Sequence, residues 1–119
     1  MQLAAGSAGA QAVGARLGEA RAAFEAVVNH LLSKAKDAPN AAYGGSVPYL
    51  MLAGNLVSGW QLAKSLLVAE AQLSADIDAE FMAGKIASAR FYAEHVLCDV
   101  EAQRRRILEG ADSLSSVVL

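Results

Sequence analysis

The stretch from Ser46 to Leu73 constrains the fold most, because it reads as one long helix with apolar side chains on nearly every face. No charged residue occurs between Ala38 and Ala63. A helix that is apolar all round is either buried among other helices or spans a membrane. Two glycines directly before it, Ser46 as a cap and Pro48 in the first turn predict where it begins. We therefore expect it to be the central helix of the fold.

Length and composition narrow the class of protein. A chain of 119 residues forms one domain, and a net charge of −2 with no basic helix face argues against nucleic acid or an anionic membrane as partners. The one candidate span, Val47 to Ala63, is barely long enough and is interrupted by polar residues. We therefore predict no membrane span, although a membrane-associated bundle stays as an alternative. A single cysteine, Cys98, excludes an internal disulfide and fits a cytoplasmic protein.

Two further helices have a clear apolar seam. The first is expected to begin between Gly9 and Gly14 and to run to about Lys36, and the third to run from about Ile77 to Glu109. Their seams are Val13, Leu17, Ala20, Phe24, Val27 and Leu31 in the first, and Met82, Ile86, Ala89, Ala93, Val96, Val100 and Ile107 in the third. Short connections favour antiparallel neighbours. The sequence therefore predicts an all-α fold, an antiparallel bundle of three long helices.

Small residues in the central helix predict close packing. Gly54, Ser58 and Ser65 line one narrow strip, and Gly59 lies beside Trp60. A glycine inside a helix costs about 1 kcal/mol relative to alanine, so two of them suggest a nearby backbone or space for the indole, and the plain alternative is that a small residue is simply dispensable there. Trp60, which shares a face with Tyr49, is expected to be buried near Phe24 or Tyr92.

The third helix carries a second surface that a three-helix bundle does not use. Phe91 and His95, with Gly84 and Ser88, lie more than a right angle away from its inner seam. Together with the all-round apolar central helix, this face indicates a missing partner. The candidate packing or docking residues are Tyr49, Gly54, Gly59, Trp60, Phe91 and His95.

Candidate chemistry is sparse. The start of the third helix is marked by Ser74, Asp76, Asp78 and Glu80, where acids complement the helix dipole, and capping is favoured over a metal site because no histidine accompanies them. His95 and Cys98 form a conceivable base and nucleophile, but no third group or oxyanion donor is apparent, so a buried or inert thiol is favoured. We predict no catalytic, cofactor-binding or metal-binding residue in this chain.

Three segments resemble a known family. They are SVPYLMLAGNLVSGWQLAK (46–64), KIASARFYAEHVL (85–97) and GADS (110–113), and their order and spacing are similar to the C-terminal helical domain of acyl-CoA dehydrogenases, in the 3-methylmercaptopropionyl-CoA dehydrogenase-like branch that carries an appended domain. The resemblance covers roughly Leu17 to Ser116, with Cys98 where a proline is expected. It divides the chain into a linker-like N-terminus with the start of helix one (1–16) and a helical C-terminal accessory domain (17–119).

The resemblance implies a structural role in a larger flavoprotein. In such enzymes the FAD, the acyl-CoA pocket and the glutamate base belong to the dehydrogenase core, which oxidises an acyl-CoA thioester to the 2,3-enoyl-CoA. This chain is then expected to bind no cofactor, to be non-catalytic alone, and to dock on that core or across its dimer as part of a homo-oligomer. The alternative is a free-standing helical protein–protein interaction module that binds a partner helix in a groove beside Trp60.

Overall fold

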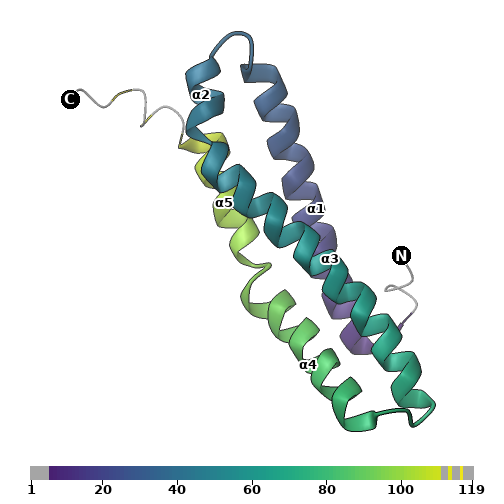
Figure 1. Ribbon diagram of the computed structural model, residues 1–119. Helices are drawn as coiled ribbons and strands as arrows, with labels where there is room; N and C mark the ends of the chain where they lie inside the picture. The colour runs from purple at the N-terminus through teal and green to yellow at the C-terminus, as the bar shows by residue number, and fades with distance from the viewer. Residues whose placement is uncertain (1–5, 111–112, 114–115, 117–119) are drawn as a thin grey trace.

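The computed structural model describes residues 6–110, 113 and 116, which form helices and no strand. In chain order the helices are α1 (Ala8–Lys34), α2 (Pro39–Gly44), α3 (Ser46–Ser74), α4 (Ala79–His95) and α5 (Asp99–Glu109). The molecule is elongated, with extents of 61 × 26 × 17 Å. α1 and α3 run antiparallel, and α4 and α5 follow one another back along α3 (Figure 1). The predicted all-α antiparallel bundle is confirmed.

The prediction of one long helix from Ile77 to Glu109 is wrong in one respect, because this stretch forms two helices, α4 and α5. The N–H groups of Val96 and Leu97 both donate to the carbonyl of Tyr92, at 2.9 and 3.0 Å. The second bond closes a wider turn than an α-helix allows, and it ends α4. Leu97 is thereby buried against Gly59 of α3. α5 then starts with Asp99 and Glu101 in its first turn, where the helix dipole favours acids.

The connection between α1 and α3 contains a helix that we did not predict. Pro39 occupies the start of α2, where a missing N–H costs nothing. Gly45 separates α2 from α3 and is the N-cap of α3, so the predicted capping role of Ser46 is wrong. A Cβ on Gly45 would lie 3.2 Å from Cγ2 of Ile107. This close approach of α5 explains a glycine at the corner.

The turn between α3 and α4 uses two aspartates in an unusual backbone conformation. Asp76 and Asp78 have φ angles of 55° and 47°, in the left-handed region that Asp and Asn adopt more readily than most residues. Asp78 is the N-cap of α4, but its side chain accepts no capping hydrogen bond, whereas Glu80 lies in the first turn as expected. Asp78 therefore occupies the N-cap position, as the capping prediction requires, but its side chain does not cap the helix.

The start of α1 is fixed by a serine that we overlooked. The Ser7 hydroxyl oxygen accepts a hydrogen bond from the Ala10 N–H at 3.1 Å, and the hydroxyl donates to the carboxylate of Glu70 on α3. From there the predicted seam holds, because Val13, Ala20 and Val27 are buried. The remaining seam residues pack against the core while partly exposed; they are Leu17, Phe24 and Leu31.

One core runs between all the long helices, with a partly buried polar contact beside it. Its largest fully buried side chains are Leu52, Leu66, Ile107, Val27 and Val100. Gln103 is also buried, and its Oε1 accepts a hydrogen bond from Asn55 Nδ2 at 3.3 Å. The Tyr92 hydroxyl donates to the Asn55 carbonyl at 3.2 Å. Asn55 therefore connects α3 to both α4 and α5.

Candidate docking surfaces

The two sides of α3 are occupied very differently. Leu52, Gly59 and Leu66 recur every seventh residue and are buried on the inner side. The opposite side carries an outer seam whose members alternate by three and four residues and are all exposed: Val47, Leu50, Gly54, Val57, Gln61, Lys64, Val68 and Ala71. Five of these are apolar, and Val47 and Leu50 are 70% and 71% exposed. The outer seam of α3 thus has no covering segment among the described residues.

The two mid-helix glycines of α3 have separate roles. Gly59 is buried, and a Cβ there would lie 2.9 Å from Cδ2 of Leu97, so the close approach predicted at this glycine comes from a side chain. Around Gly54 a Cβ would meet nothing within 4 Å, and Ser58 and Ser65 are exposed. The predicted close packing of this strip is therefore wrong within the described residues.

The predicted burial of Trp60 is wrong. Its side chain is 40% exposed, and Lys64 Nζ lies 3.9 Å from the ring centroid, a cation–π contact. The two aromatics expected beside it have other partners. Phe24 stacks on Tyr49 at 5.9 Å, and Tyr92 bonds to the Asn55 backbone. With Leu97 filling the space next to Gly59, the indole lies at the edge of the outer side of α3.

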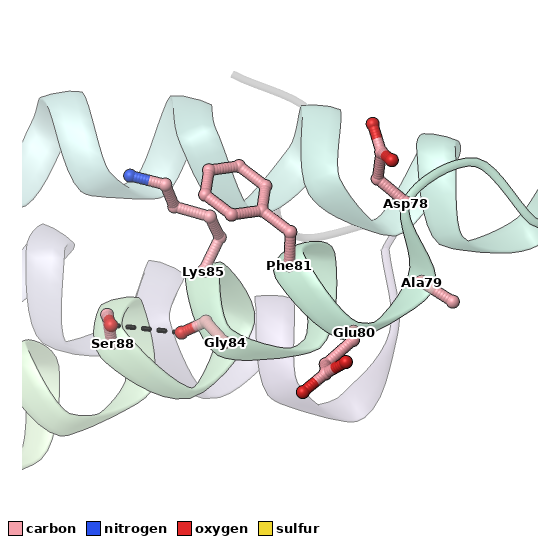
Figure 2. A pocket seen from close by; sticks show the side chains of 7 residues that line it. All are labelled: Asp78, Ala79, Glu80, Phe81, Gly84, Lys85 and Ser88. Carbon is pink, nitrogen blue, oxygen red and sulfur yellow. Dashed lines mark hydrogen bonds between the residues drawn. The ribbon is translucent and has the colours of Figure 1, made fainter.

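A second exposed face runs along α4 and the turn before it. Its members also alternate by four and three residues, and all are exposed: Ile77, Phe81, Gly84, Ser88, Phe91 and His95. Phe91 is 60% exposed, as predicted, and stacks on His95 with centroids 4.5 Å apart. A shallow open hollow lies at the start of this face, floored by Gly84 and Ser88 and flanked by Phe81 and Lys85 (Figure 2).

The residues of this hollow do not fit a flavin or a metal. Asp78 and Glu80 line it, and these acids would repel the pyrophosphate of FAD. The hollow is also open to solvent, whereas cofactor sites enclose most of the ligand. Within the described residues no group of three or more His, Cys, Asp and Glu side chains is placed to hold a metal ion. Cys98 is exposed at the N-cap of α5.

Charge is concentrated away from the outer seam of α3. On α1, Arg16 pairs with Glu19 at 2.9 Å and Arg21 with Glu25 at 3.1 Å. On α4, Arg90 pairs with Glu94 at 3.5 Å.

On α5, Glu101 bonds to Arg104 at 2.6 Å and to Arg105 at 3.5 Å. The hydrogen bonds from Arg104 hold the pKa of the Glu101 carboxyl below its ordinary value. These exposed pairs indicate surfaces that face water.

The described residues include no helix that is long and apolar enough to cross a membrane. The apolar outer seam of α3 is interrupted by Gln61 and Lys64, and it is backed by a buried side that packs on α1, α4 and α5. Its apolar residues therefore suit contact with another protein surface.

Comparisons with known proteins agree with the resemblance seen in the sequence. The family model described as acetyl-CoA dehydrogenase C-terminal like matches residues 1–117. A 3-methylmercaptopropionyl-CoA dehydrogenase from Ruegeria pomeroyi is 51% identical over 118 residues, which is 99% of this chain and 20% of the relative. The chain thus spans about a fifth of that relative's length. It belongs to the acetyl-CoA dehydrogenase C-terminal-like family.

Proposed function

We propose that this chain is the accessory C-terminal domain of an FAD-dependent acyl-CoA dehydrogenase and is non-catalytic by itself. The observation that carries this proposal is the 51% identity to 3-methylmercaptopropionyl-CoA dehydrogenase over 99% of the chain. In the parent enzyme the FAD and the glutamate base would lie in the dehydrogenase core, which oxidises an acyl-CoA thioester to the 2,3-enoyl-CoA in fatty acid metabolism. A cytoplasmic, homo-oligomeric enzyme is part of the proposal.

The part of the chain that would contact the dehydrogenase core is the outer face of α4. Phe91 and His95 form a stacked aromatic pair there, and the Lys85 ammonium group lies over the ring of Phe81. Aromatic side chains are enriched at protein interfaces because they bury much area with few rotatable bonds. Tyr49 and Gly59, also considered as docking residues, are engaged with Phe24 and Leu97 inside the bundle. Gly54 and Trp60 lie on or beside the outer seam of α3, so Phe91 and His95 are the candidates that belong to the α4 face and are the proposed contact with the core.

A chimera tests this function directly. The matching region of the Ruegeria pomeroyi relative is replaced by this chain, and flavin content and oxidation of 3-methylmercaptopropionyl-CoA are measured. We expect the chimera to keep both. Phe91→Asp should lower the midpoint of thermal unfolding or reduce the rate of oxidation several-fold. Leu32→Asp is the matched control, because Leu32 is a large apolar residue 70% exposed on α1.

The outcomes separate the parts of the proposal. An inactive chimera, or equal effects of Phe91→Asp and Leu32→Asp, would contradict the docking role. The isolated chain is incubated with FAD and an acyl-CoA and then separated from the free FAD. The recovered protein should be colourless, and no enoyl-CoA should form during the incubation. A flavin absorption band that co-purifies with the chain would contradict a non-catalytic domain.

A further inference from the structure

The outer seam of α3 has the spacing of a helix-pairing surface. Steps of three and four residues repeat from Val47 to Ala71, as in the first and fourth positions of a heptad. The residues flanking the seam are uncharged, and they include Met51, Ser58, Trp60, Ser65 and Leu67. Such a seam is suited to another helix lying lengthwise along it, because an uncharged border lets the partner cover the apolar residues without stranding a charge.

We infer that this helix is α3 of a second copy of the same chain, packed antiparallel about a two-fold axis that crosses the outer seam between Val57 and Gln61. In this register Val47 lies opposite Ala71, Leu50 opposite Val68, and Val57 opposite Gln61, each with its equivalent in the other copy. Lys64 lies opposite Gly54, so the longest side chain of the seam meets the residue with none. Around Gly54 a Cβ would meet nothing within 4 Å in its own chain, which leaves room for that lysine.

Charge on the seam does not oppose the pairing of identical copies. Lys64 is the only charged residue of the seam, and its counterpart would lie ten helical positions away, or about 15 Å along the axis. That distance exceeds the Debye length of about 10 Å at 0.1 M salt, so repulsion between the two lysines is largely screened. A polar residue at one such position also fixes the register of paired helices.

The exposed area is sufficient for a dimer. Six apolar side chains lie on or beside the seam with exposures from 40% to 71%; they are Val47, Leu50, Met51, Val57, Trp60 and Val68. Covering them would bury roughly 400–500 Å² per copy, or close to 1,000 Å² in the pair, before polar flanks are counted. The axis would bring Trp60 next to Trp60 of the second copy on one side of the seam and Ser58 next to its own equivalent on the other.

This pairing specifies the homo-oligomer of the proposed function, but its test needs neither flavin nor substrate. In a Cys98→Ser background, the chains Leu50→Cys and Val68→Cys are mixed and oxidised. The antiparallel register predicts that the mixed disulfide forms at least ten times more than either homodisulfide, because like positions lie about 27 Å apart along the axis. Ala22→Cys, on the exposed side of α1, gives the background of random collisions.

Sedimentation equilibrium provides the second readout. We expect a concentration-dependent mass rising from 12.3 kDa towards twice that value. Val57→Lys, at the centre of the seam, should weaken association at least tenfold, while Phe91→Lys on α4 should not. Circular dichroism checks that both exposed-site variants keep their helices. An excess of homodisulfides, or a mixed disulfide at the level of random collisions, would overturn the antiparallel pairing. So would equal effects of Val57→Lys and Phe91→Lys on association.

Discussion

The outer sides of α1 and α3 differ although both helices belong to the same bundle and have nearly equal length. On α1 that side carries Arg16, Glu19, Arg21 and Glu25, which form ion pairs one turn apart. On α3 the corresponding side holds valines, leucine and glycine with one lysine. The charged side of α1 is typical of a surface that faces water. The apolar outer seam of α3 is typical of a surface that contacts another protein.

The largest expected effect separates the inner and outer sides of α3. Leu66 is fully buried and Leu50 is 71% exposed, so the same truncation tests both sides of one helix. At concentrations low enough to keep the chain monomeric, Leu66→Ala should lower the free energy of unfolding by about 2–5 kcal/mol. Leu50→Ala should change it by less than about 0.5 kcal/mol. Urea denaturation followed by circular dichroism measures both, and equal losses would mean that the outer seam is covered in the monomer.

The glycines of α3 and α4 give a finer comparison. Gly59→Ala forces a Cβ to within 2.9 Å of Leu97, so we expect a loss of about 1–3 kcal/mol in unfolding free energy from overpacking. Gly54→Ala meets no atom and should stabilise the monomer by up to about 1 kcal/mol through helix propensity.

The matched control for the glycines is Gly84→Ala on α4, which is also unobstructed and should stabilise similarly. At high concentration, only Gly54→Ala should weaken association, since it alone reduces the space for Lys64 of the second copy. A destabilised Gly54→Ala monomer would show that a segment of the chain already packs there.

The smallest effect concerns the charged surfaces. Because Arg104 lowers the pKa of Glu101 in the folded chain, this carboxylate contributes stability that is present above its unfolded pKa and is lost as the pH falls through its folded pKa. Glu101→Gln should therefore cost about 0.3 kcal/mol at pH 7 and nothing once the carboxyl is protonated in both states. Urea midpoints at pH 7 and at pH 2.5 measure this, and a pH-independent loss would argue against the ion pair.

Periodicity predicted the parts of the fold that depend on repeated burial. The residues of the α1 seam and of the seam in the third helical stretch are all buried or half-buried, because one apolar stripe leaves little choice of which side faces the core. α3 lacks a single stripe, so the sequence could not show whether Trp60 or Leu66 lies inside. In the structure, Gly59 packs against Leu97, so the side of α3 that carries Gly59 and Leu66 faces the core. This contact joins residues far apart in the sequence and leaves no local signal.

The break between α4 and α5 also depends on long-range packing. Apolar spacing continues through Val96, Leu97 and Val100 as if the helix were unbroken, and there is no proline or glycine at the break. Phe91 and His95 were found because their side of the helix disagreed with the inner seam, whereas the outer seam of α3 emerged once the structure showed that Gly59 and Leu66 face inward.

The most direct test of the claim that the outer side of α3 is a contact surface uses its one indole. Trp60 is the only tryptophan of the chain and is 40% exposed at the edge of the outer seam. Its emission should shift to shorter wavelength, and its quenching by acrylamide should fall, as the concentration of the chain rises from below one micromolar to hundreds of micromolar. Val57→Lys should abolish both changes. Emission and quenching that stay constant over the whole range would contradict the claim.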